Sequence, residues 1–278
     1  MAYVSVGGSR LHVMDSGSGE ALFLLHGNAG SGAVWNNVIP DLAKHFRVIA
    51  HDRAGFGLSE EAETVDRGPQ DYADELRELM AALDIPSAHI CGISFGGMVA
   101  QSFALKYPDL VKRLVLVGTT ADRTGRSVPD SLAELEREGW PAVADRLVRS
   151  WFRPESNPED IKEAYAIAMQ SSQRMRELTL TALGHFDIRD RIHRIAAPTL
   201  VVVGQQDMTC PLAMSQTVHQ EIAGSRLVTV ADCAHLVPVE QPRSFLQSVL
   251  PFLRSGGDGA GDRTAQGNPD SPRTLRPG

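Results

Sequence analysis

Two kinds of apolar pattern alternate over the first 120 residues of this chain. Short continuous apolar runs are typical of strands buried on both faces, whereas apolar residues three and four positions apart are typical of amphipathic helices. A glycine pair, Gly7-Gly8, predicts a hairpin between the first two strands. The predicted strands cover residues 3–6, 11–14, 21–25, 47–51, 88–92 and 114–117, and the predicted helices cover 33–44, 71–83 and 96–106.

The alternation is interrupted after about residue 120 and resumes near residue 191. In between, the pattern contains no strand and predicts four helices, over residues 131–138, 141–152, 158–169 and 174–185. Afterwards it predicts strands over 199–203 and 226–230 and helices over 212–222 and 241–253. Strands that alternate with helices indicate an α/β fold, here a mostly parallel eight-stranded sheet with helices on both faces and an antiparallel edge.

The interruption also predicts how the chain divides. Residues 1–120 and 191–254 are expected to form the α/β core, and residues 121–190 a helical cap over the carboxyl ends of the strands, where such sheets bind ligands. Residues 255–278 are mostly Gly, Asp, Pro, Arg, Ser and Thr, which cannot bury a core. This tail is therefore predicted to be disordered.

Charge and composition narrow the class of protein. The chain has 27 Lys and Arg against 34 Asp and Glu, a net charge of −7, and its acidic residues are scattered. This balance argues against nucleic acid or an anionic membrane as the main partner. The apolar runs are too short to span a bilayer, and the first ten residues have no signal-peptide pattern. Three distant cysteines favour a reducing cytoplasm over a disulfide framework, and no pair has the spacing of metal ligands.

Ser94 is the strongest candidate for chemistry. It lies at the centre of Gly92-Ile93-Ser94-Phe95-Gly96, between a predicted strand and a predicted helix. This context is typical of a nucleophile elbow, in which a strained turn presents the serine hydroxyl at the carboxyl edge of the sheet. Glycines two positions before and after the serine allow the neighbouring backbone to pass closely.

A serine nucleophile needs a base, and the base needs an acid that orients it. Asp207 follows the predicted strand 199–203, and His235 follows the predicted strand 226–230, so the chain order is Ser, Asp, His. Asp122, after the strand 114–117, is an alternative acid. The alternatives to these roles are a chance GxSxG match, a turn-forming aspartate and a surface histidine.

The developing oxyanion requires two hydrogen-bond donors. The backbone N–H groups of Phe95 and Asn28 are the expected pair, because one follows the nucleophile and the other lies in the glycine-rich loop after the third strand. Alternatively, residues 26–32 form only a flexible connection. Candidate pocket walls, for which plain packing is an equal alternative, are His26, Trp35, Trp140, Trp151, Phe152 and Phe186. The loop 52–59 is expected to hold neighbouring loops in place.

Five segments of the chain together resemble those of α/β-hydrolase fold enzymes that carry a helical cap. They are His26-Gly27-Asn28, the loop 52–59, the elbow around Ser94, Gly204-Gln205-Gln206-Asp207 and Ala234-His235. The resemblance extends over residues 1–254. Within that superfamily the chain most resembles the 3-oxoadipate enol-lactonase-like group, through residues 97–101, 107–111 and 139–152.

The resemblance implies a serine hydrolase that cleaves a small carboxylic ester or lactone without a metal or an organic cofactor. Two other functions stay open. The same triad serves carbon–carbon bond hydrolysis of a diketone or ring-fission product, and a non-catalytic small-molecule receptor can use the same fold. The sequence does not predict an oligomeric state.

Overall fold

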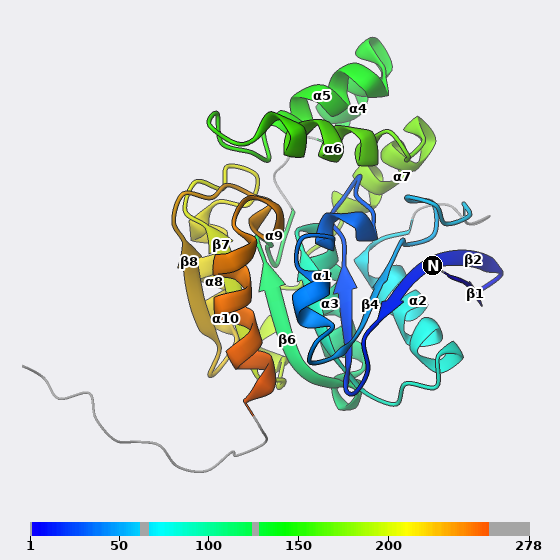
Figure 1. Cartoon of the computed structure of the whole chain (residues 1–278). Helices are drawn as coiled ribbons and strands as arrows, with labels where there is room; N and C mark the ends of the chain where they lie inside the picture. Colours follow the sequence, from blue (N-terminus) through cyan, green and yellow to red (C-terminus); the bar gives the residue numbers. More distant parts are fainter. Residues whose placement is uncertain (1, 62–66, 124–127, 256–278) are drawn as a thin grey trace, which may run out of the picture.

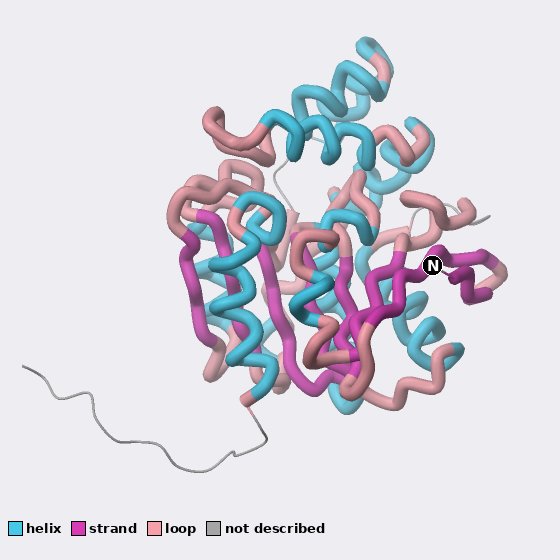
Figure 2. Tube along the Cα trace, in the orientation of Figure 1, coloured by secondary structure: helices cyan, strands magenta, loops and turns pink. Residues whose placement is uncertain are grey.

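The computed structural model describes residues 2–61, 67–123 and 128–255, and within these ranges one eight-stranded sheet organises the chain (Figures 1 and 2). The strands lie in the order β1-β2-β4-β3-β5-β6-β7-β8. The pairs β1–β2 and β2–β4 are antiparallel, and all other neighbours are parallel. Their bounds are β1 Ala2–Val6, β2 Ser9–Ser16, β3 Ala21–Leu25, β4 Arg47–His51, β5 Ala88–Ile93, β6 Val111–Val117, β7 Thr199–Gly204 and β8 Arg226–Val230.

Helices cover both faces of the sheet, and each face has its own apolar core. The side chains of β6 alternate between the two cores, with Leu114 and Leu116 on one side and Val115 and Val117 on the other. The first core includes α2 (Pro69–Ala82), α3 (Phe95–Lys106) and α8 (Leu212–Glu221). The second includes α1 (Ile39–Leu42), α9 (Val237–Glu240) and α10 (Pro242–Arg254). Both predicted features, the parallel sheet and its two helical layers, are confirmed.

In the described part of the segment between β6 and β7 there are four α-helices, where the sequence predicted four helices. Figure 1 shows them beyond the tip of the β6 arrow, at the carboxyl ends of the parallel strands. Their bounds are α4 Val128–Glu138, α5 Trp140–Arg149, α6 Pro158–Ala168 and α7 Gln173–Leu183. We refer to residues 128–183, which contain these helices and the loops between them, as the helical insertion. The exact division of the chain into core and cap stays a prediction, and the predicted disordered tail lies, apart from Ser255, outside the described residues.

One predicted helix is wrong. The stretch 33–44 forms a short 3₁₀ helix, η1 (Gly32–Trp35), followed by a separate short helix, α1. Pro40 explains the break, because proline has no N–H to donate and is tolerated only in the first turn of a helix, where it lies in α1. The short elements η2 (Pro108–Leu110), η3 (Ile192–Arg194) and α9 were not predicted. Within the described ranges, no helix combines the length and apolar character needed to cross a bilayer.

Candidate active site

Ser94 occupies a sharp turn between β5 and α3. Its backbone angles are φ 54° and ψ −117°, which an L-residue adopts only under strain. Strand β6 and the residues just after it hold the turn, since the Ser94 N–H donates to Val117 O at 2.9 Å and the Thr119 hydroxyl donates to Ser94 O at 2.8 Å. A Cβ on Gly92 or Gly96 would collide with backbone atoms of the turn or of β3, so the glycine spacing is a steric requirement.

His235 and Asp207 form a buried pair behind the turn. His235 Nδ1–H donates to Asp207 Oδ2 at 2.7 Å, and both residues are almost completely buried. The other carboxylate oxygen, Oδ1, accepts the backbone N–H groups of Thr209 and Cys210, each at 2.8 Å. The carboxylate is therefore fixed on both oxygens, and His235 Nε2 is the ring nitrogen left for the serine. The alternative acid, Asp122, instead lies 3.7 Å from Arg189.

Gly118 makes room for this pair. Its φ is +46°, and a Cβ at this position would lie 2.9 Å from Asp207 Oδ2 and 3.2 Å from His235 Nδ1. Both values are shorter than ordinary carbon contacts. Glycine is therefore required here for backbone conformation and for space alike.

The loop that carries His235 is tied to the helical insertion. The His235 N–H donates to Trp151 O at 3.0 Å. The buried Glu240 carboxylate accepts the Ala234 N–H at 2.7 Å and also accepts the Ser156 hydroxyl. The position of the histidine thus depends on contacts with residues that follow α5.

Arg53 fixes the glycine-rich loop after β3 by hydrogen bonds to its backbone. Its guanidinium donates to His26 O and, at 3.1 Å, to Gly27 O, and it stacks on the Phe95 ring with Cζ 4.5 Å from the centroid. Burial lowers the pKa of Arg53 to about 10, so it stays charged at neutral pH. His26 Nε2 accepts the backbone N–H of Arg53 at 3.1 Å, and burial holds the pKa of His26 well below its usual range. His26 is therefore neutral and structural.

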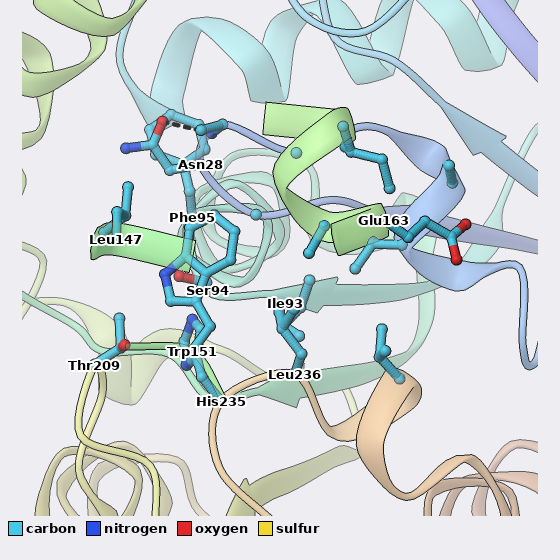
Figure 3. A pocket seen from close by; sticks show the side chains of 18 of the residues that line it. Asn28, Ile93, Ser94, Phe95, Leu147, Trp151, Glu163, Thr209, His235 and Leu236 are labelled. Atoms are coloured by element: carbon cyan, nitrogen blue, oxygen red, sulfur yellow. Dashed lines mark hydrogen bonds between the residues drawn. The ribbon is translucent and has the colours of Figure 1, made fainter. Parts of the chain in front are cut away.

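The two residues expected to supply the oxyanion donors both line the cavity that contains Ser94. Asn28 and Phe95 line it together with Ser94 and His235 (Figure 3). The Asn28 side chain is engaged locally, because its Oδ1 accepts the Ala29 N–H at 2.9 Å. Within the described residues, neither the Asn28 N–H nor the Phe95 N–H has a hydrogen-bond acceptor. Both amides are thus available to a ligand oxygen.

Of the six predicted pocket residues, the structure places one, Trp151, in the cavity wall. Trp35 instead packs on Phe245 beneath α10, with ring centroids 5.9 Å apart. Trp140 donates its Nε1–H to Ala168 O inside the helical insertion, and Phe186 belongs to the core of the sheet. Phe152 is buried in the opposite core, and His26 is enclosed by Arg53 and Gly27. These five were placed wrongly because aromatic character alone does not distinguish a wall from a core.

The cavity has walls that the sequence did not predict. Most are apolar, contributed by the insertion and by the segment after His235, and include Leu147, Ala164, Ile167, Leu236 and Val239. Charged residues also reach it, namely Arg123, Asp160, Glu163 and Arg176. No sequence signal separated these helix positions from solvent-facing ones. Among the described residues, no cluster of His, Cys, Asp and Glu could hold a metal ion.

The fold and this site define the class of protein. The family model for the alpha/beta hydrolase fold matches residues 20–242, so the chain belongs to the α/β-hydrolase fold family. This finding confirms the resemblance of the sequence to that superfamily.

Relatives within the family differ in the bond they cleave. The chain is 31% identical, over 90% of its length and 95% of the relative's, to a 2-hydroxy-6-oxo-2,4-heptadienoate hydrolase of Pseudomonas putida. It is 30% identical to a 3-oxoadipate enol-lactonase of Acinetobacter baylyi, over 80% of this chain and 84% of the other. Among solved structures, the enol-lactonase from Burkholderia xenovorans superposes with a TM-score of 0.86 at 26% identity, covering 91% and 99% of the two chains.

Proposed function

We propose that this α/β-hydrolase cleaves a small carboxylic ester or lactone through an acyl-enzyme on Ser94. The observation that carries the proposal is the buried His235–Asp207 hydrogen bond of 2.7 Å beside a strained serine in one cavity. Such an arrangement has little structural purpose, because the strain and the burial of a charged carboxylate both cost stability.

The geometry suggests the role of each group. Ser94 Oγ attacks the substrate carbonyl while His235 Nε2 accepts its proton, and Asp207 stabilises the imidazolium that forms. The Asn28 and Phe95 N–H groups bind the oxyanion, and Phe95 begins α3, whose dipole adds positive potential. His235 then returns the proton to the leaving alcohol. Water, deprotonated by His235, attacks the acyl carbon; the bond to Ser94 Oγ breaks, His235 gives its proton to Oγ, and the acid leaves.

Carbon–carbon bond hydrolysis is the second candidate. It is favoured by two relatives, the heptadienoate hydrolase above and a 2-hydroxymuconate semialdehyde hydrolase of Pseudomonas that is 32% identical over 88% of this chain. A non-catalytic receptor receives no comparable support from the site, because Ser94 and His235 line one cavity and His235 is bonded to Asp207, as a serine hydrolase would require.

A substrate panel tests the proposal. Lactones, short aryl esters and vinylogous diketones are offered to the wild type and to Ser94→Ala. We expect ester or lactone turnover that Ser94→Ala reduces by about four orders of magnitude or more. Turnover of the diketones alone would favour the second candidate. Tight ligand binding without turnover of any class would favour a receptor.

A cytoplasmic location is also part of the proposal. All three cysteines, Cys91, Cys210 and Cys233, are free and buried, which suits a reducing compartment.

A further inference from the structure

A buried arginine in the wall of the cavity has no function in the mechanism above. Arg176 projects from α7, is 8% exposed and lines the same cavity as Ser94 and His235. Its Nε and Nη1 atoms are enclosed, and within the described part of the chain they have no hydrogen-bond acceptor. A buried guanidinium normally has its N–H groups satisfied, since leaving them unpaired is costly.

An aromatic ring holds Arg176 in place. Its guanidinium lies over the Trp140 ring, with Cζ 5.4 Å from the centroid. Trp140 is itself fixed, because its Nε1–H donates to Ala168 O at 3.2 Å. Stacking of this kind engages the face of a guanidinium and leaves its N–H edges for an acceptor.

The charge that shifts the pKa of Arg176 is that of another cation, Arg123. Burial first, and then the neighbouring charge of Arg123, lower the pKa of Arg176 to about 10, so it remains protonated at neutral pH. Arg123 lines the same cavity. The guanidinium of Arg176, unpaired at Nε and Nη1 within the described residues, therefore gives the cavity wall a positive charge that attracts an anion.

The acidic residues of the cavity do not neutralise Arg176. Asp160 and Glu163 belong to α6, and Figure 3 shows Glu163 on the side of the cavity away from Trp151 and His235. Burial and the charge of Glu240 raise the pKa of Asp160, the opposite of what a nearby arginine would do. No ion pair between Arg176 and either acid is present among the described residues.

We infer that Arg176 binds a carboxylate of the substrate, so that the preferred substrates are half-esters or lactones that carry a second, free carboxylate. This inference rests on the proposed function, because it places the bound acyl compound in the cavity of Ser94. A planar carboxylate fits the N–H edge of a guanidinium and replaces the missing acceptors. The reacting carbonyl stays at Ser94. Hydrolysis adds one water, which gives a dicarboxylate and an alcohol from a half-ester, or a single hydroxy-dicarboxylate from a lactone.

Two kinds of measurement test the inference. The first compares kcat/KM for monomethyl glutarate with that for methyl pentanoate, a neutral ester of equal chain length. The second measures by calorimetry the binding of glutarate, and separately of inorganic phosphate. Both use the wild type, Arg176→Met, Arg176→Lys and a matched control, Arg174→Met, which makes the same substitution at an exposed position of α7.

We expect the wild type and Arg174→Met to prefer monomethyl glutarate by about 100-fold or more, the scale of one charged hydrogen-bonded pair. Arg176→Met should remove this preference while methyl pentanoate turnover changes less than about threefold, and Arg176→Lys should retain part of it. Glutarate should bind the wild type and Arg174→Met but not Arg176→Met, and phosphate should bind all of them weakly.

Other outcomes separate the two proposals. The carboxylate site would be overturned if Arg176→Met preferred monomethyl glutarate as strongly as the wild type does. It would also be overturned if Arg176→Met lost kcat/KM equally with both esters. Either result would leave the hydrolase function intact. Phosphate binding as tight as glutarate binding would also overturn the carboxylate site, in favour of a general anion site. If the protein turned over no ester or lactone, the proposed function would fail, whereas glutarate binding that depends on Arg176 would still support the carboxylate site.

Discussion

The guanidinium of Arg53 lies against the ring of Phe95, with Cζ 4.5 Å from the ring centroid, while its N–H groups donate to the carbonyl oxygens of His26 and Gly27. One buried cation therefore contacts both segments that supply the proposed oxyanion donors. Sequence reasoning expected the loop 52–59 to hold neighbouring loops in place. Because Arg53 also contacts Phe95, we expect it to fix the positions of both proposed oxyanion donors and so to affect catalysis.

Replacing Arg53 should therefore impair turnover more than binding. In Arg53→Lys the single ammonium cannot donate to both carbonyls and stack on Phe95, so the two amides lose their alignment. We expect kcat to fall by about 10-fold to 100-fold, somewhat less than the roughly 100-fold to 1,000-fold loss caused by removing an oxyanion donor outright, with KM changed less than threefold. Steady-state kinetics measure both constants. A lowered melting temperature with kcat unchanged would show that Arg53 only stabilises the fold.

Gly118 offers a test of the His235–Asp207 pair. Gly118→Ala should reduce kcat by at least about tenfold, because its Cβ would push on Asp207 Oδ2 and His235 Nδ1. Gly224→Ala is the matched control, since Gly224 also has positive φ, +70°, but a Cβ there meets no atom within 4 Å. Both variants should lose about 1 kcal/mol of unfolding free energy from backbone strain. Equal activity of the two variants would contradict this reading of the site.

Glu240 should control the position of the base. Its carboxylate accepts the Ala234 N–H, next to His235, and the Ser156 hydroxyl in the helical insertion. Glu240→Ala should lower kcat several-fold and lower the melting temperature, because a buried N–H would lose its acceptor. The exposed Glu159→Ala is the control. If Glu240→Ala kept full activity, the insertion would not be coupled to the base through this carboxylate.

Acid should destabilise the fold through two buried histidines. Burial lowers the pKa of His51 to about 3 and holds that of His26 well below 6.5, so both are neutral when folded. Each of these two side chains therefore binds a proton more readily in the unfolded chain than in the folded protein. The stability they support is therefore complete above pH 6.5 and is lost as the pH falls below that value.

For His51 alone, this loss should reach on the order of 3 kcal/mol by pH 4. In His51→Gln the unfolding free energy should change less steeply with pH between 6.5 and 4. The difference in slope should correspond to nearly one fewer proton bound on unfolding. The exposed His45→Gln should keep the wild-type slope. Denaturant titrations at several pH values measure the slopes, and identical slopes for wild type and His51→Gln would contradict the prediction.

The sheet and its order of elements could be predicted because buried parallel strands have a clear signature. Leu22 to Leu25 and Val201 to Val203 are continuous apolar runs, and the helices between strands show their own spacing. The elbow was equally predictable, since Ser94 needs glycines at fixed offsets. The stretch 33–44 was mispredicted because apolar spacing was followed past Pro40.

The walls of the cavity could not be predicted in the same way. Trp35 and Trp151 are alike in the sequence, but one packs against Phe245 and the other faces the cavity. Which side a residue faces depends on how the helices of the insertion pack over the sheet, and this is a tertiary property. Arg176 shows the limit most clearly, because nothing in the helical pattern around it distinguishes a buried arginine from an exposed one such as Arg174.

Covalent labelling of the serine tests the central claim most directly. A fluorophosphonate is incubated with the wild type, Ser94→Ala and His235→Asn, and the intact mass and the labelled peptide are determined. We predict one adduct per chain on Ser94 in the wild type, none in Ser94→Ala, and labelling slowed by about 100-fold or more in His235→Asn. An adduct on another residue, or labelling of Ser94→Ala at the wild-type rate, would contradict the assignment of Ser94 as the nucleophile.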